Sequence, residues 1–209
     1  YVVGAEETSE LVTWLQTHGY NVSDNMTPVM DVYNGADGRF LALKLKDGKE
    51  TTDIVPVAMT YVDDAPMIPI QLTAVAAQPL MGILVYVMGA ESYDSANFTV
   101  VAPDTDEILF DGDANTNYFD WVARASDEAN GKLFVREYMG ANPLDGQTVD
   151  GIKLEGARLT RLYTRMSPHH MTTDPIFEVV TGFEQSNILD LSAHTTLWSC
   201  GSVIQGRLP

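Results

Sequence analysis

Hydrophobic and polar positions follow a helical period in two parts of this chain. Between Glu6 and Gly19, apolar residues return every three or four positions behind a cluster of glutamates. A second pattern of this kind runs from Tyr118 to Ala129 and is closed by Asn130-Gly131, a common helix ending. The two patterns predict two amphipathic helices.

Strand-like patterns occupy several other segments. Leucines alternate with Ala42 and lysines in the segment 39–46, which ends at an Asp47-Gly48 turn. Pro56 removes a ladder donor from the segment 53–62, so a strand there is expected at an edge or a bulge. Further strands are predicted at 1–4 and 132–139, a strand or a helix at 158–166, a long loop or junction at 142–156, and irregular structure after residue 167.

The segment 65–90 contains no charged residue. Its prolines and Gly82 interrupt helical hydrogen bonding, which argues against a membrane-spanning helix. It divides instead into MIPIQLTAVAA and MGILVYVMG, two stretches of strand length that are apolar at nearly every position. We therefore expect two central strands of a sheet that is covered on both faces.

Together these elements predict an α+β fold, a mixed and mainly antiparallel sheet with two amphipathic helices packed on it. Residues 1–156 are expected to form the α+β core, and residues 157–209 a carboxy-terminal strand and extended tail. Because the sequence opens directly on the strand-like YVVG, we expect the core to be part of a larger domain whose amino-terminal half lies outside this sequence.

The charge composition of the chain indicates which classes of binding partner are not expected. The chain has 29 acidic and 12 basic residues and a formal net charge of −17. Binding to nucleic acid or to an anionic membrane surface needs a positive surface, so neither is expected. The single cysteine, Cys200, has no partner for an internal disulfide and is expected to bridge to another segment or another chain.

Five motifs along the chain resemble one bacterial family. They are LVTWLQTHGYNV, FLALKLK, PMIPIQLTAVAAQPLMGILVYVMG, NYFDWVARASDEANGKLFVREY and LTRLYTRMSPHHMTTDPIF. From about Tyr1 to Phe177, their order resembles the domain of unknown function family 2330 (DUF2330). The resemblance implies an exported protein of the bacterial cell envelope that begins with a signal sequence, a cysteine-containing segment and an additional β-rich half. It implies no activity, because the family has none established.

The segment DGDANTN offers oxygen ligands at alternate positions, as calcium loops do. These candidate metal ligands are Asp111, Asp113, Asn115 and Asn117. An EF-hand is excluded, because Thr116 stands where the loop needs glycine and Val122 where it needs glutamate. The alternative is an Asx-rich loop that caps the following helix. Calcium is the only cofactor that the sequence suggests.

Other chemistry-bearing residues give weaker patterns. Adjacent His169 and His170 are expected to point in different directions, on a surface turn near Asp174, and His18 and His194 lie far away in sequence. Cys200 lacks the supporting pattern of a catalytic nucleophile, and no nucleotide-binding glycine motif occurs. If the segment 158–166 is a strand, Arg161 and Arg165 share a face and are able to clamp an anion or a carboxylate partner. The alternative is that these arginines and Arg158 pair with surface acids of the same chain.

The sequence thus favours a non-catalytic exported structural or interaction module of a cell envelope or extracellular assembly. Its expected location is the periplasm, the outer envelope or the extracellular space, and its expected partner is the missing amino-terminal half or another protein chain. Two alternatives stay open. One is a calcium-stabilised binding domain. The other is an envelope hydrolase with a site shared with the missing half, for which the candidate carboxylates are Asp104, Asp106, Asp111 and Asp120.

Overall fold

The fold of the 209-residue chain is known from a computed structural model. It describes residues 1–34, 38–50, 53, 57–60, 62, 65–109, 116–149, 151–190 and 205–207. The predicted α+β class is confirmed: helices accompany mainly antiparallel sheets, with one parallel strand pair, β5–β6. The helices are α1 (Thr8–Thr17), α2 (Thr27–Tyr33), α3 (Ile70–Thr73) and α4 (Tyr118–Glu128), with a 3-10 turn, η2 (Pro168–His170).

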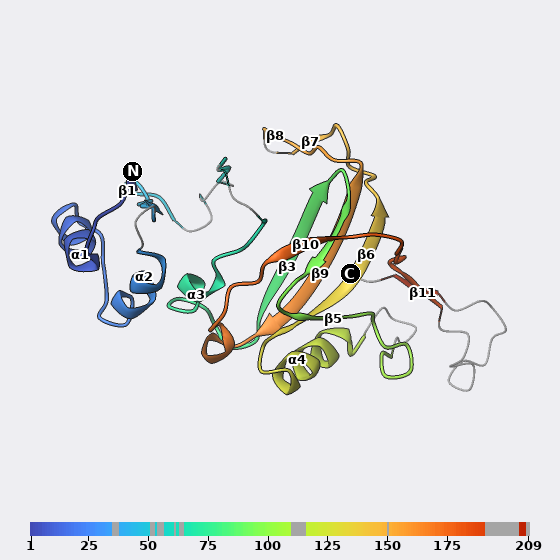
Figure 1. Ribbon diagram of the computed structural model, residues 1–209. Coiled ribbons are helices and arrows are strands. Elements are labelled where there is room, and N and C mark those ends of the chain that lie inside the picture. The colour runs from blue at the N-terminus through green and yellow to red at the C-terminus, as the bar shows by residue number, and fades with distance from the viewer. Residues whose placement is uncertain are drawn as a thin grey trace.

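A four-stranded sheet forms the centre of the molecule (Figure 1). Its spatial order is β3 (Met81–Gly89), β9 (Arg158–Met166), β6 (Leu133–Ala141) and β5 (Thr99–Val101). The first three strands pair antiparallel, whereas β5 lies parallel to β6. The β3–β9 pairing is unbroken from Met81 opposite Met166 to Gly89 opposite Arg158.

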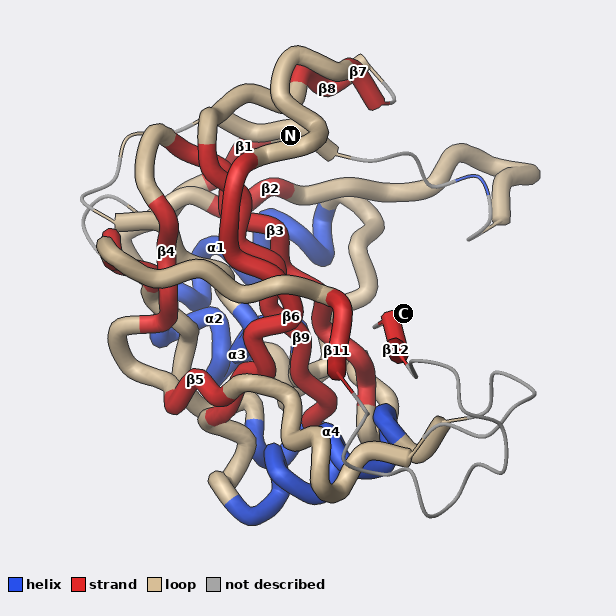
Figure 2. The backbone as a smooth tube through the Cα atoms, turned by 90° about the vertical axis from the view of Figure 1, so that its right-hand side faces the viewer, coloured by secondary structure: helices blue, strands red, loops and turns tan. Residues whose placement is uncertain are grey.

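Smaller two-stranded ladders surround this sheet. They are β1 (Val2–Val3) with β2 (Phe40–Leu41), β4 (Ser92–Ser95) with β10 (Phe177–Val180), β7 (Thr148–Val149) with β8 (Ile152–Lys153), and β11 (Ile188–Asp190) with β12 (Gln205–Arg207). In Figures 1 and 2, β7 and β8 lie at one end of the large sheet and α4 at the other.

Each face of the central sheet contributes to its own hydrophobic cluster. On one face, Trp121 and Val122 of α4 pack on Val135 and Leu133 of β6. On the other face, Phe134 and Leu162 pack with residues from α3, the segment after η2, and β10. Amphipathic α4 therefore lies on the sheet, as the sequence predicts.

The amphipathic helix α1 packs elsewhere, in a small amino-terminal lobe. Leu11 and Leu15 of α1 form a cluster with Met30 of α2 and Ala42, and Val3 and Phe40 of the β1–β2 ladder pack against it. Figure 1 shows this lobe beside the central sheet, and in the perpendicular view of Figure 2 α1 and α2 lie behind the strands.

The uncharged segment 65–90 differs from its prediction in two respects. Its first half is not a strand, because Ile70–Thr73 form α3 and a turn follows. Its second half is the predicted strand β3, but β3 is an edge strand with one exposed face rather than a central strand. Among the helices in the described ranges, none is both long and apolar enough to cross a membrane.

In the segment 39–46, only Phe40–Leu41 form a strand. The alternation of this segment does not bury its leucines. Ala42 is buried, whereas Leu41, Leu43 and Leu45 are exposed. In the segment 53–62, residues 53, 57–60 and 62 are described and none lies in a strand, so the strand predicted there is wrong for those positions.

The strands predicted at 1–4 and 132–139 are confirmed, and the segment 158–166 is a strand, β9. Contrary to the expectation of irregular structure after residue 167, β10 pairs with β4 along Phe177–Val180. Because β9 lies between β3 and β6, it belongs to the same sheet as strands that precede Gly156. The division of the chain after Gly156 stays a prediction.

Candidate interaction surface

The solvent-facing side of β3 is apolar. Ile83, Val85 and Val87 point into the core cluster, so the alternate residues point outward. Of these, Leu84 is 43% exposed and Tyr86 47% exposed. A soluble sheet face normally carries polar residues at such positions, and this strand carries none.

Two arginines of β9 lie on the same face as Leu84 and Tyr86. The register places Arg161 opposite Tyr86 and Arg165 opposite Gly82. The Arg161 guanidinium lies 5.8 Å from the Tyr86 ring centre, and that of Arg165 lies 5.7 Å from the Phe119 ring centre. We call this face the arginine–aromatic surface; it comprises Leu84, Tyr86, Phe119, Arg161, Tyr163 and Arg165.

The rings of this surface support one another. Tyr163 lies between the strands and α4, with its ring centre 5.7 Å from that of Phe119 and 6.1 Å from that of Tyr118. Gly82 makes room for it, because a Cβ at that position would lie 2.6 Å from the Tyr163 hydroxyl oxygen. The rings of this surface thus pack against one another in a contiguous layer.

A buried carboxylate lies beneath this layer. The register of β6 against β9 shifts between Arg136 and Tyr138, a bulge that leaves Glu137 between them. Glu137 is 1% exposed and accepts a hydrogen bond from the Tyr118 hydroxyl at 2.5 Å. Its second oxygen, Oε2, lies 2.9 Å from Nε of Arg161. Arg161 thus connects the buried acid to the exposed rings.

Burial shifts the pKa values of Glu137 and Tyr118. Burial raises the pKa of Glu137, while the Tyr118 hydroxyl and the Arg161 charge oppose the rise. Burial and the nearby Glu137 charge also raise the pKa of Tyr118, which keeps this phenol protonated. The Tyr118 hydroxyl thus donates a hydrogen bond to one carboxylate oxygen of Glu137, and Arg161 forms an ion pair with the other.

A second ion pair lies elsewhere in the sheet region. Arg136 of β6 forms an ion pair with Asp94 of β4, and its guanidinium lies 4.1 Å from the Phe183 ring centre. Burial raises the pKa of Asp94, and Arg136 opposes the rise. Sequence reasoning missed both Asp94 and Glu137. The available signal was the Arg136-Glu137 dipeptide inside the otherwise apolar strand pattern KLFVREYM.

A family model described as "Uncharacterized protein conserved in bacteria (DUF2330)" matches residues 1–178. The chain belongs to the DUF2330 family. The resemblance seen in the five motifs is therefore confirmed. No curated protein and no solved structure matches the chain. All six residues of the arginine–aromatic surface lie within the matched DUF2330 region.

The predicted calcium loop of this DUF2330 chain is only partly described. Asp111, Asp113 and Asn115 lie outside the described residues, so the calcium prediction stays a prediction. Asn117 accepts a hydrogen bond from the backbone N–H of Leu109 and donates one to the carbonyl of Glu107. These bonds tie the two ends of the loop together before α4 begins.

Among the residues that the structure describes, the other predicted ones do not meet in one site. Cys200 and His194 lie outside the described residues, as does Asp111. Asp104, Asp106 and Asp120 are exposed, and Asp104 accepts a hydrogen bond from the backbone N–H of Asp106 within a turn. Arg158 donates to Ser92 and pairs with Glu184, so it pairs with a surface acid, as the alternative predicts.

The histidine pair of this DUF2330 chain does lie on a surface turn, η2, as predicted. Its rings nevertheless converge, with centres 3.9 Å apart, and the acid beside them is Asp127 rather than Asp174. Asp174 instead accepts hydrogen bonds from Tyr33 and from the backbone N–H of Gln71.

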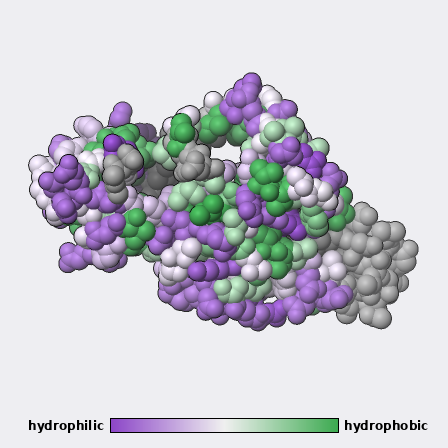
Figure 3. Space-filling view, in the orientation of Figure 1, coloured by the Kyte–Doolittle hydropathy of each residue, from purple (hydrophilic) through white to green (hydrophobic). Residues whose placement is uncertain are grey.

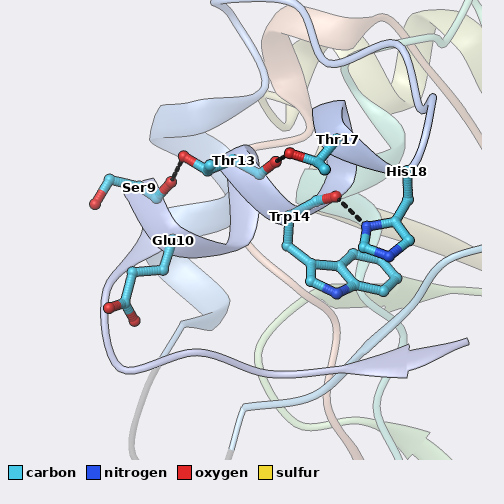
Figure 4. Close-up of a pocket in the computed structure, with 6 residues that line it drawn as sticks. All are labelled: Ser9, Glu10, Thr13, Trp14, Thr17 and His18. Carbon is cyan, nitrogen blue, oxygen red and sulfur yellow. Dashed lines mark hydrogen bonds between the residues drawn. The ribbon is translucent and has the colours of Figure 1, made fainter.

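A depression of about 470 Å³ lies on α1, away from the arginine–aromatic surface. Figure 4 shows that its lining residues all come from this helix and its end: Ser9, Glu10, Thr13, Trp14, Thr17 and His18. The Trp14 and His18 rings stack with centres 3.9 Å apart, and the Thr13 and Thr17 hydroxyls donate to backbone carbonyls of the same helix. The depression is therefore a groove along one helix, and none of the shifted carboxylates lines it.

Proposed function

We propose that this DUF2330 chain is a non-catalytic, exported interaction module of the bacterial envelope that associates through β3 with a second copy of itself. One observation carries the proposal: β3 is a nine-residue edge strand without a charge, a proline or a register shift. In the described part of the chain, no strand pairs with its outer side.

An edge of this kind favours strand addition. Its outward N–H and C=O groups form a template for another strand, and natural sheets usually block such edges with charges, prolines or bulges. Here the exposed apolar side chains Leu84 and Tyr86 add surface that a partner strand would cover.

A second copy fits the edge by charge and by symmetry. The chain carries a net charge of −17, so two copies repel each other over most surfaces, but MGILVYVMG adds no like-charge contact. Antiparallel pairing about Val85 sets Leu84 of one copy opposite Tyr86 of the other, an aliphatic–aromatic cross-strand pair. A two-fold axis relates the two copies in such a contact, so the assembly ends at a dimer.

Export and the envelope location rest on the family resemblance. The hydrolase alternative would need an accessible carboxylate with a shifted pKa. Glu137 has the shift but is sealed between Tyr118 and Arg161, so we do not propose catalysis.

The test is sedimentation equilibrium of the purified chain over a range of concentrations. The wild type is expected to form dimers. Leu84→Lys combined with Tyr86→Lys sets two pairs of ammonium groups opposite each other across the two-fold axis and is expected to give a monomer. Leu43→Lys is the matched control, because Leu43 is 61% exposed and lies outside β3.

Hydrogen exchange separates strand pairing from other contacts. In the dimer, backbone amides of β3 are expected to exchange more slowly than in the variant that combines Leu84→Lys with Tyr86→Lys, whereas amides of α1 exchange equally in both. A wild type that stays monomeric at every concentration contradicts the proposal, and so does a double variant that dimerises as the wild type does.

A further inference from the structure

Three potential metal ligands meet at the end of α4. Single donor atoms from Asp127, His169 and His170 all lie within 4.8 Å of one another. Nε2 of His170 is 3.8 Å from Oδ1 of Asp127, and the two imidazole ring centres are 3.9 Å apart. Sequence spacing did not indicate this group, because Asp127 lies far from the histidines along the chain.

The backbone holds the group in place from both sides. The 3-10 turn η2 is closed by hydrogen bonds from His170 to Ser167 and from Met171 to Pro168. The end of α4 is closed at Gly131, whose φ is +77°, by a bond from its N–H to the Ser126 carbonyl. A Cβ at Gly131 would lie only 2.4 Å from the His170 Cβ, so the two segments are in close contact.

The charge around the group favours a cation. Asp127 and Glu128 are exposed and occupy the last turn of α4, which holds no basic residue. The carboxyl end of a helix carries partial negative charge, so acids there are unfavourable unless a cation is near. A bound cation would offset the two carboxylates and the helix end together.

We propose that Asp127, His169 and His170 bind a divalent transition ion, with zinc as the ion that the ligands suit best. Imidazole nitrogens prefer zinc and its neighbours to calcium or magnesium, and two histidines with one carboxylate are a known zinc ligand set. Water fills the remaining position. This site is separate from the β3 edge and does not depend on the proposed association.

Binding requires a small closure of the three side chains. Ligand atoms about 2.1 Å from a common zinc ion lie roughly 3.4 Å apart in a tetrahedral site. The present separations, all within 4.8 Å, are therefore up to about 1.4 Å too large. Asp127 is 71% exposed and His169 is exposed, so both can close by side-chain rotation alone.

The test is calorimetric titration of the full chain with zinc chloride, with magnesium chloride as the hard-ion comparison. The wild type is expected to bind one zinc ion per chain at this site and not to bind magnesium there. Asp127→Asn and His169→Gln each remove one ligand without loss of core packing. Each is expected to weaken zinc binding at least about tenfold.

Two substitutions serve as matched controls. Glu128→Gln removes the neighbouring exposed carboxylate, and His18→Gln removes an exposed histidine on α1. His18→Gln is expected to keep the wild-type affinity within a factor of about two, and Glu128→Gln is expected to weaken it less than either ligand variant does, because it removes a nearby charge but no ligand. X-ray absorption at the zinc edge is expected to show nitrogen and oxygen ligands only. Zinc binding that both ligand variants retain, or a sulfur ligand in the spectrum, overturns the proposal, as does a wild type that binds no zinc.

Discussion

At the scale of single residues, the central sheet tolerates charge because each charged group has a partner. Glu137 lies buried on a bulge, where the Tyr118 hydroxyl donates a hydrogen bond to one carboxylate oxygen and Arg161 forms an ion pair with the other. Arg165 is different, because its Nε bonds to the Leu80 carbonyl and its guanidinium lies over the exposed Phe119 ring. The two arginines of one strand face therefore contribute unequally to stability.

Arg161→Met is expected to lower the free energy of unfolding by about 3 kcal/mol, because it leaves the buried Glu137 carboxylate without its charge partner. Arg165→Met, the matched control on the same strand, is expected to cost less than about 1 kcal/mol. Urea denaturation of the two variants measures the difference. Equal losses would show that the Glu137–Arg161 pair does not stabilise the sheet.

Stability should also depend on pH through the buried acids. Because burial raises the pKa of Glu137 and of Asp94, the folded state holds these protons to higher pH than the unfolded state does. The favourable contribution is thus fully present below the ordinary values of 4.5 and 3.8, and it is lost as pH rises through the folded-state values.

We therefore expect the free energy of unfolding to fall from about pH 4.5 upward, and to fall less steeply in Glu137→Gln. Urea denaturation at a series of pH values measures both slopes. Glu128→Gln changes the net charge equally from an exposed position, so it separates the buried site from general repulsion. A Glu137→Gln slope equal to that of the control variant would contradict the assignment.

At the scale of elements, the charge content of a strand did not predict whether it lies inside the sheet or at its edge. Uncharged β3 is at the edge, whereas β9, with its three arginines, is an inner strand. Helical periodicity predicted α1 and α4, and short segments rich in apolar residues predicted β6 and β3, because these local patterns specify the elements. Which strand lies inside depends on distant partners, such as Glu137 for Arg161, and a local pattern does not contain them. For the same reason, the local sequence pattern did not predict that Asp127 lies beside His169 and His170.

The contact between the α4 end and η2 gives a prediction at this scale. Gly131→Ala is expected to destabilise the fold by more than about 2 kcal/mol, because it strains a positive φ and collides with His170. Gly146→Ala has a similar φ of +76° but meets no atom within 4 Å, so it is expected to cost about 1 kcal/mol. Thermal unfolding compares them, and equal shifts would contradict close packing of η2.

At the scale of the whole molecule, the amino-terminal lobe and the central sheet have separate hydrophobic clusters. A hydrogen bond links them: the Tyr33 hydroxyl of α2 lies 2.7 and 2.6 Å from the two carboxylate oxygens of Asp174, which follows η2. Leu72 of α3 also packs against the lobe cluster. Figure 3 shows that hydrophilic residues predominate over the lobe and over the α4 side of the sheet, whereas separate hydrophobic patches lie over the sheet.

Tyr33→Phe is expected to let the lobe open more easily without loosening the sheet, because a hydrogen bond to a carboxylate contributes about 1.5 kcal/mol. Amide exchange in α1 and α2 should then rise about tenfold, while exchange in β6 and β9 stays unchanged. Tyr20→Phe is the control, since its hydroxyl bonds within the lobe to the Ala42 carbonyl. Equal acceleration throughout the chain would show that the lobe and the sheet unfold together.

The pairing of β3 with β9 also sets the order in which the chain can fold during synthesis. Met166 follows Gly89 by 77 positions, and β9 is the only sheet neighbour of β3 in the described part of the chain. At about 5–20 residues per second, a ribosome needs roughly 4–15 s to supply that neighbour. During this interval the uncharged MGILVYVMG segment remains unpaired on the nascent chain, where a holding chaperone would find an extended apolar target before the native sheet can form.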